Sequence, residues 1–476
     1  PLRFGFGRIM TDVIPTALVK RTLVEFLTQG QKQARQANES VLVSLAYPLL
    51  CNMNSHACFS ACEPAAFRAF WGRPDEDFWL VGKGIVVEFI SDGFTSVDKA
   101  ADRYDSLLKT ALIKAPDIRG VGPIILGGFR FDTEVPKDAN WRCFPDSMLV
   151  LPRFLFTRSG GSTWLTINTI VVPEADVALQ VEALVAELQA MDIRSPGKKH
   201  QPAIKHIHQD SPEQYVRYVR SALKDIGEGR LIKVVLARRK ILYADRQFSL
   251  AYALGKLCRN YPDCATFAID NGEASFFGST PESLVRINQG RLSLTCLAGS
   301  IARGNNPEED IRLEKQLFES SKERIEHTAV VVSVTTSLED LCGDLQWDRE
   351  PQILKLRNVQ HLLTSVTGSL YSGNSILGIV KRLHPTPSVA GVPTDRAMSF
   401  ICNGENDRGW YAAPVGWVDH TGGGEFAVGI RSALLGDKRA ILYAGAGIVE
   451  GSDPDREFQE TELKFQPLMA ALGRSR

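Results

Sequence analysis

Two pairs of glutamates are the residues of this sequence best suited to bind a metal ion. Glu323 and Glu326 lie in KERIEH, and Glu457 and Glu460 lie in REFQETELK. A spacing of three residues places both carboxylates of a pair on one face of a helix. A single pair of this kind is more typical of a solvated charged surface. Two pairs on two helices can instead build an oxygen site for Mg²⁺, which prefers carboxylates together with water and substrate oxygens.

Lys233 could accept a proton. In GRLIKVVLARR it alternates with Val235 and Ala237, so a strand here turns the lysine toward an apolar face. A lysine on such a face either extends its amine to the surface or has a function. A desolvated amine can lose its proton and act as a general base.

Other polar residues stand in turns and strand ends. Glu282 follows a proline in FFGSTPESLVR, where an exposed acid is the simplest interpretation. His361 lies in the apolar VQHLLT and could be a satisfied core histidine. Arg431, in GIRSALL, could bind a carboxylate through two parallel hydrogen bonds. LAGSIARG adds Gly299 and Ser300, a glycine-plus-hydroxyl loop.

The segment ILYAGAGIVEGSDPDRE combines a predicted strand with a helix that starts near Pro454 and is capped by Asp453. Gly445 and Gly447 allow a ligand to approach the backbone closely. A dinucleotide site is disfavoured, because the loop is long, the helix is acidic and no βαβ unit surrounds it.

The balance of charged residues limits the kinds of partner that the protein can bind. Lys+Arg and Asp+Glu are both 55, so the net charge is zero. We therefore expect no nucleic acid and no anionic membrane as the main partner. No apolar run is long enough for a membrane span.

The nine cysteines are scattered, which is typical of a reducing compartment. Cys51, His56, Cys58 and Cys62 lie close together in the sequence, but a zinc site usually has tighter CxxC pairs. We expect buried or loop thiols in this segment.

Strand-like segments follow one another closely, which favours antiparallel pairing with few helical crossovers. We predict an α+β fold (α/β in the broad sense), with large antiparallel sheets enclosing the site and helices packed outside. Helices are expected at 177–191, 211–229, 310–341 and 454–472; strands at 41–50, 84–90, 149–156, 164–172, 233–242, 265–270, 274–279, 283–287, 292–300, 409–419, 424–435 and 439–449.

Ten segments together resemble the chorismate-utilising enzymes, which comprise isochorismate, salicylate, anthranilate and aminodeoxychorismate synthases. They stand in family order across about residues 208–474: KVVLAR (233–238), GSTPESLVR (278–286), LAGS (297–300), SKERIEH (321–327), VQHL (359–362), LHPTPSVAG (383–391), GWYAAPVGW (409–417), IRSALL (430–435), AGAGIV (444–449) and REFQETELK (456–464). GGFRFD (127–132), with Trp141 and Phe144, is similar to the isochorismate synthase branch.

This resemblance implies a Mg²⁺-dependent isomerase that converts chorismate to isochorismate. Lys233 would activate water for attack at C2, and Glu282 would protonate the leaving C4 hydroxyl. Glu326 and Glu460 would bind Mg²⁺, with Glu323 and Glu457 as additional ligands or acceptors for metal-bound water. The remaining implied substrate-binding residues are Gly299, Ser300, His361, Tyr411, Arg431, Gly445 and Lys464.

The segment around 196–212 is rich in Pro, Lys and His and lacks an apolar period, so we expect a connector there. With the resemblance, this divides the chain into a possible extension or trimmed terminus (1–15), an N-terminal part of the same fold (16–195), the connector (196–212) and a chorismate-binding catalytic core (213–476). The resemblance implies a monomer without an obligatory glutaminase. The enzyme would be cytoplasmic, or plastidial if a targeting segment has been removed. Its product would serve menaquinone, phylloquinone, siderophore or salicylate biosynthesis.

The branch depends on residues 384–391. They read HPTPSVAG, the isochorismate form, whereas the amine-forming enzymes are closer to GTxSGAPK. Ser388 departs from the alanine expected there, and a hydroxyl at this place could bear on pyruvate elimination. Salicylate synthase is therefore the first alternative and the amine branch the second. A catalytically inactive chorismate-binding module is disfavoured, because Lys233, Glu282 and all four glutamates are present together. A metal-dependent hydrolase of an anionic ester is a further alternative.

Overall fold

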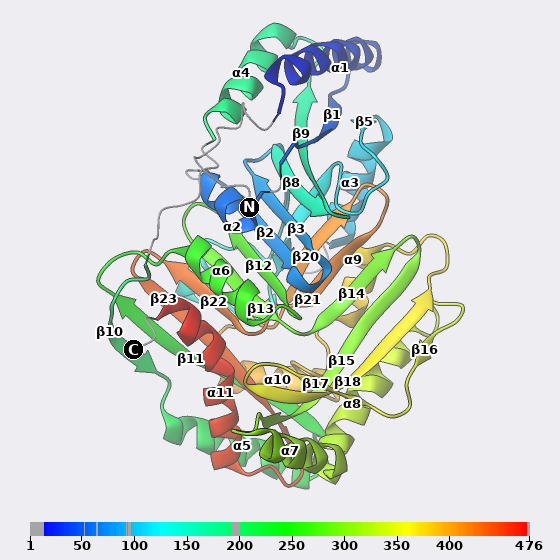
Figure 1. The fold of residues 1–476 in the computed structure, drawn as a ribbon. Helices are drawn as coiled ribbons and strands as arrows, with labels where there is room; N and C mark the ends of the chain where they lie inside the picture. Colours follow the sequence, from blue (N-terminus) through cyan, green and yellow to red (C-terminus); the bar gives the residue numbers. More distant parts are fainter. Residues whose placement is uncertain are drawn as a thin grey trace.

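The computed structural model describes residues 14–51, 53–62, 65–91, 93, 97–191 and 200–473 of the chain. The extension expected at residues 1–15 falls almost wholly outside these ranges. Two large sheets form the centre of the molecule, and helices pack around them (Figure 1). Within the described residues β1 and β5 are the only parallel pair, so the antiparallel α+β prediction is confirmed.

The first sheet has 13 strands. In spatial order they are β10 (Ile204–Gln209), β11 (Lys233–Ala244), β23 (Arg439–Val449), β22 (Ser432–Gly436), β13 (Ser275–Thr280), β12 (Ala265–Asp270), β2 (Arg68–Arg73), β3 (Phe78–Lys83), β8 (Phe154–Ser159), β9 (Ser162–Val171), β1 (Val41–Pro48) and β5 (Leu112–Lys114), while β19 (Gly391–Val392) pairs with β11.

The second sheet has 10 strands. Their order is β16 (Gln346–Trp347), β18 (Val359–Ser369), β15 (Arg291–Ala302), β14 (Ser283–Asn288), β21 (Gly424–Val428), β20 (Pro414–Asp419), β6 (Ile124–Phe129), β7 (Ser147–Leu151) and β4 (Val87–Ser91), while β17 (Gln352–Lys355) pairs with β18.

Helices gather at opposite ends of the sheets. In Figure 1, α1 and α4 lie together at one end, and α5, α7, α8 and α11 lie at the other. Of the described helices, none is long and apolar enough to cross a bilayer. Their bounds are α1 (Thr16–Ala37), α2 (Ser55–Ala61), α3 (Val97–Lys109), α4 (Val177–Gln189), α5 (Pro212–Gly227), α6 (Leu250–Asn260), α7 (Pro307–Glu319), α8 (Ser321–Leu338), α9 (Ile376–Leu383), α10 (Thr394–Gly404) and α11 (Pro454–Leu472).

Residues before and after the predicted connector share both sheets. In the first sheet β2 pairs with β12, and in the second β6 pairs with β20. Glu425 is fully buried and accepts hydrogen bonds from Trp71 and from Arg73, at 3.2 and 2.7 Å. Because a buried charge needs a partner, these bonds tie the two parts of the chain together.

The connector prediction is wrong for part of its length. Residues 204–209 form β10, which pairs with β11 at the edge of the first sheet. An edge strand has one neighbour and one solvated side, so it tolerates the polar residues that led us to expect a loop. Residues 196–199 lie outside the described ranges.

The predicted helix at 310–341 is two helices. Ser320 has an extended backbone, and its hydroxyl accepts a hydrogen bond from the Glu323 amide, so it caps α8 directly after α7. A serine placed this way ends one helix and begins the next. The break positions the start of α8, which carries Glu323 and Glu326.

The predicted strand at 424–435 is also two strands, and they belong to different sheets. β21 lies in the second sheet and β22 in the first, with Gly429–Arg431 crossing between them. A second crossing joins β13 to β14 through Pro281 and Glu282. Arg431 therefore leaves the strand conformation and adopts a positive φ of 49°. Both crossings bring a charged residue to the junction of the sheets.

Candidate functional site

One cavity, here called the central cavity, lies where β11, β23 and the two sheet crossings meet α8 and α11. It brings together most of the predicted site residues. They are Lys233, Glu282, Gly299, Ser300, Glu326, His361, Tyr411, Arg431, Gly445, Glu460 and Lys464. Glu323 and Glu457 line an adjoining depression that shares Ser300 and Glu460 with the central cavity.

Lys233 stands at the start of β11 and is only 1% exposed. Its Nζ lies 2.9 Å from Oε1 of Glu326 on α8. The pair depends on Gly447 of β23, because a Cβ there would lie 2.4 Å from the Glu326 oxygen and 3.1 Å from Cε of Lys233. The alternation in GRLIKVVLARR thus places the amine inside the protein, with a carboxylate beside it.

Glu282 lies at the crossing from β13 to β14 and is 5% exposed, so the interpretation as an exposed acid is wrong. Burial raises the pKa of its carboxyl group to about 7, against an opposing hydrogen bond from the Ser388 hydroxyl. A carboxyl group with this pKa carries a proton for much of the time at neutral pH and can donate it. The contact with Ser388 could not be derived from sequence spacing.

Arg431 is buried, and no carboxylate of a described residue lies within ion-pair distance of it. Its Nη2 donates to Nε2 of His361 at 3.3 Å. Because arginine has no acceptor, neutral His361 must carry its proton on Nδ1, which lies 2.9 Å from the Ser300 hydroxyl. Burial, with the Arg431 charge, holds the pKa of His361 well below its ordinary value. A buried guanidinium without a carboxylate suits an anionic ligand.

Two further predicted residues complete the wall around β23. Lys464 on α11 donates to the Gly445 carbonyl at 2.8 Å and pairs with Glu460 at 2.6 Å. Tyr411 is buried, and its hydroxyl would lie 3.1 Å from a Cβ at position 445. Burial raises the pKa of Tyr411 to about 12, so its hydroxyl remains a donor at neutral pH.

Glu323 and Glu457 lie in the first turns of α8 and α11, and Glu326 and Glu460 follow one turn later, so each pair is helical as its spacing predicted. Asp453 caps α11 by accepting from the Asp455 and Arg456 amides, and Pro454 occupies the first turn. A bulge in β15 at Gly299 turns the Ser300 amide toward Glu323, at 3.1 Å. Lys322, which sequence analysis did not single out, donates to Glu457 at 2.8 Å and lies 3.4 Å from Glu323.

The crowding of these acids tests whether a cation fits. Burial and the neighbouring charge of Glu326 raise the pKa of Glu323 to about 7, and burial and Glu460 raise that of Glu457. Burial is the larger cause of each shift, and the neighbouring carboxylate adds to it. A divalent cation would offset the contribution of the neighbouring carboxylate. Among the described residues no group of three or more acids, histidines or cysteines is placed to hold a metal ion. A cation bound by two of these glutamates would have to complete its coordination with a ligand and water.

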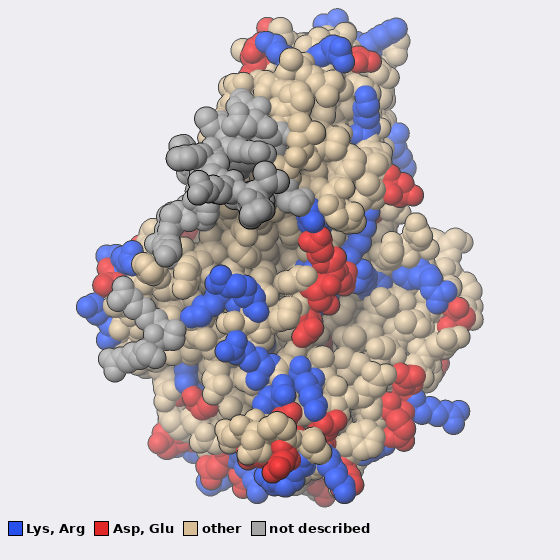
Figure 2. All heavy atoms as spheres, in the orientation of Figure 1, with Lys and Arg blue, Asp and Glu red and all other residues tan. Residues whose placement is uncertain are grey.

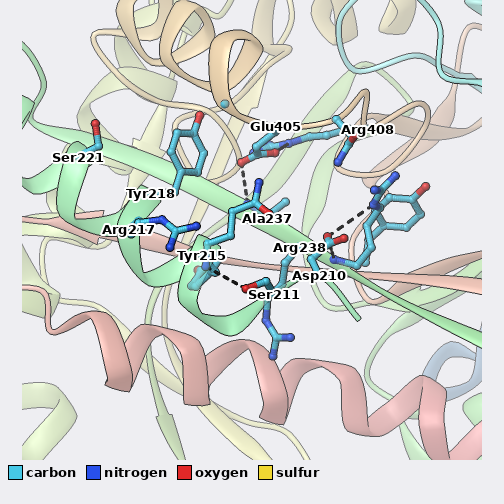
Figure 3. A pocket seen from close by; sticks show the side chains of 15 residues that line it. Asp210, Ser211, Tyr215, Arg217, Tyr218, Ser221, Ala237, Arg238, Glu405 and Arg408 are labelled. Atoms are coloured by element: carbon cyan, nitrogen blue, oxygen red, sulfur yellow. Dashed lines mark hydrogen bonds and ion pairs between the residues drawn. The ribbon is translucent and has the colours of Figure 1, made fainter. Parts of the chain in front are cut away.

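A second pocket lies beside the open edge of β11, between β10 and β19 (Figure 3). Glu405 accepts from the Ala237 amide at 2.7 Å, and Arg408 donates to the Val235 carbonyl at 2.7 Å. Within the described ranges no strand pairs with this stretch of β11 on the side between β10 and β19, and these two side chains bind its free backbone groups instead. They thereby hold in place the strand that carries Lys233. The sequence analysis did not single out either residue.

The cysteine segment is remote from this chemistry. Cys58 and Cys62 are buried free thiols and Cys51 is half-buried, as expected for core and loop positions. Burial raises the pKa of Cys58, so its thiol stays protonated and unreactive.

The face drawn in Figure 2 carries charged side chains of both signs. Aspartates and glutamates gather in a stripe near the middle of this face, and lysines and arginines gather beside and below the stripe.

A family model described as chorismate binding enzyme matches residues 29–473. The chain belongs to the chorismate-binding enzyme family. Among its relatives, the isochorismate synthase MenF of Bacillus subtilis is 31% identical over 466 residues, covering 96% of this chain and 99% of the relative. The salicylate biosynthesis isochorismate synthase of Pseudomonas aeruginosa is 34% identical over 409 residues, covering 85% and 84%.

A solved member of the chorismate-binding enzymes has the same fold. MenF, the menaquinone-specific isochorismate synthase from Escherichia coli, matches with a TM-score of 0.76 at 25% identity, covering 94% of this chain and 99% of that one. The family to which the ten segments pointed is thus confirmed.

Proposed function

We propose that this chain is an isochorismate synthase, which converts chorismate to isochorismate. The observation that carries the proposal is one cavity holding a buried amine, Lys233, a buried carboxyl group, Glu282, and a buried guanidinium without a carboxylate, Arg431. The reaction needs a base, an acid and an anion-binding group at one ring. The names of the relatives agree with this choice.

In the proposed reaction, the Lys233 amine accepts a proton from water as the water oxygen forms a bond to C2 of the ring. The ring double bonds shift, and the bond from C4 to its hydroxyl breaks. Glu282 gives its proton to that hydroxyl, which leaves as water. One water enters and one leaves, so the product is an isomer of the substrate. Base and acid each contribute about 10²- to 10⁴-fold in reactions of this kind.

The substrate carries two carboxylates, which need cationic or hydrogen-bonding partners. Arg431 and the Tyr411 hydroxyl are the proposed donors, together with a backbone approach at Gly445. Lys464, His361, Gly299 and Ser300 would line the same ring site. Burial strengthens these contacts, because water does not compete for them.

Mg²⁺ is the proposed metal, with Glu326 and Glu460 as the residues that would hold it. When bound, it would supply positive charge for the ring carboxylate of chorismate. Glu323 and Glu457 would accept hydrogen bonds from its water ligands. The position of Glu323 and Glu457 in a depression that shares Glu460 with the central cavity supports this arrangement.

Product identification tests the proposal. The protein is incubated with chorismate and MgCl₂, with and without ammonium, and products are separated by chromatography and identified by mass. Isochorismate alone is the expected product. Salicylate with pyruvate would instead assign the chain to the salicylate synthases. Dependence on ammonium would assign it to the amine branch, and the absence of turnover would leave a binding module. We expect activity from the single chain without a glutaminase.

A further inference from the structure

Two hydroxyl groups of the loop between α9 and β19 accompany Glu282, and one of them belongs to Ser388, which lines the central cavity beside Glu282. The Ser388 hydroxyl donates to Oε1 of Glu282, and the Thr386 hydroxyl lies 2.6 Å from that of Ser388. Ser388 has a single proton, and it is committed to Glu282. Thr386 must therefore be the donor to Ser388, so the three groups form a directed chain.

The loop holds this chain in place from its backbone. The amides of Val389 and Ala390 both donate to the Thr386 carbonyl at 3.0 Å. Arg408 donates to the Val389 carbonyl at 2.8 Å. The Val235 amide donates to the Ala390 carbonyl, also at 2.8 Å. Ser388 is thus fixed between β11 and the central cavity. Its hydroxyl needs no rearrangement to meet the carboxyl group.

Glu282 has no other hydrogen-bond donor to its carboxyl group among the described side chains. The other charged and titratable residues near Glu282 influence its carboxyl group by their charge or by contact, without a hydrogen bond to it. They are Lys233 on β11, Arg431 at the sheet crossing, Lys464 on α11, Tyr411 and Cys296. The Ser388 hydroxyl is therefore what fixes the rotation of the carboxyl group.

We propose that Ser388 is a positioning residue, which holds Oε1 of Glu282 so that Oε2 carries the proton to the leaving hydroxyl of the substrate. This inference rests on the proposed role of Glu282 in isochorismate formation. It explains a residue at which the chain departs from the alanine expected from the family resemblance. Ser388 acts through Glu282 and forms no bond to the reacting atoms.

Steady-state kinetics between pH 6 and 9 test the inference. Ser388→Ala removes a hydrogen bond to an ionisable group, and kcat should fall about tenfold with KM within about twofold. The alkaline limb of the kcat profile should move to higher pH, because the lost donor had favoured the Glu282 carboxylate. Ser388→Thr, which keeps the hydroxyl, should restore both. Ser399→Ala, an exposed serine on α10, is the matched control and should match the wild type.

A double-mutant cycle separates positioning from a general packing effect. Adding Ser388→Ala to Glu282→Gln should cause no further loss of kcat, because Ser388 acts only through the acid. The inference is overturned if Ser388→Ala keeps the wild-type kcat and pH limb, or if it lowers kcat equally in the Glu282→Gln background. If the wild type forms no isochorismate at all, the proposed function fails first, and that result is distinct from these.

Discussion

The central cavity has a sheet side, formed by the two sheet crossings, and a helix side, formed by α8 and α11. The charged groups of the two sides have different partners. On the sheet side, the Glu282 carboxyl group meets a neutral hydroxyl and the Arg431 guanidinium meets a neutral imidazole. On the helix side, Lys322 pairs with Glu323 and Glu457, and Lys464 pairs with Glu460. The ion pair between Lys233 and Glu326 joins the two sides.

This difference suggests a division of labour. Burial raises the pKa of the Glu282 carboxyl group to about 7, so this group can give up a proton near neutral pH. The carboxylates gathered on α8 and α11 supply the oxygen ligands that a divalent cation prefers. The sheet side thus suits proton transfer, and the helix side suits anchoring of a metal and an anionic substrate.

The strongest test of this division removes the base. Lys233→Ala should lower kcat about 10³-fold, since the amine accepts the proton from water. Affinity for Mg²⁺ should change far less. Lys224→Ala, at an exposed site on α5, is the matched control and should retain full activity. A Lys233→Ala rate within threefold of the wild type would exclude this residue as the base.

Substitutions on the helix side should change the Mg²⁺ concentration that is needed for activity. Glu326→Gln should raise the Mg²⁺ midpoint for activity more than about 100-fold, because it removes a proposed ligand. Glu457→Gln should raise it about tenfold, the size typical of a supporting residue. Both midpoints are read from initial rates against MgCl₂ concentration. Equal midpoints in the two variants would contradict the distinction between ligand and support.

The smallest expected effect tests whether the two sides are independent. Gly447→Ala adds a methyl group on the sheet side, 2.4 Å from a glutamate oxygen of the helix side. Displacing that flexible side chain should cost about tenfold in kcat and little in melting temperature. Gly436→Ala, where a Cβ meets nothing within 4 Å, is the control. An unchanged kcat for Gly447→Ala would show that the Lys233–Glu326 contact is dispensable.

Helices and strands with a regular apolar period were predictable from the sequence. The points where a helix breaks or a strand passes to the other sheet were not. The helix that begins at Pro454 was expected from its cap, its proline and its apolar period. The single residue that separates α7 from α8 could not be inferred, because Ser320 caps one helix inside an otherwise helical run. The crossings at Glu282 and Arg431 were also missed, since a strand pattern does not record which sheet each half joins.

The candidate site was predictable in its members and less so in its contacts. Spacing placed the glutamates on helix faces and Lys233 on an inward face, and the family resemblance supplied Glu282 and Tyr411. Neither could pair Glu282 with Ser388 or Lys322 with Glu457, because these partners come from distant segments. Roles of the site residues in catalysis and metal binding stay predictions for the experiments above.

Glu425 limits how this enzyme can be divided or transplanted. It belongs to the stretch that carries the site, yet its hydrogen-bonding partners Trp71, Arg73 and Arg119 all come from the part of the chain before the connector. A fragment beginning after the connector would keep every group of the central cavity and expose this carboxylate without its counter-charge. The N-terminal strands are therefore structural parts of the catalytic unit, and the chemistry is not portable as a module.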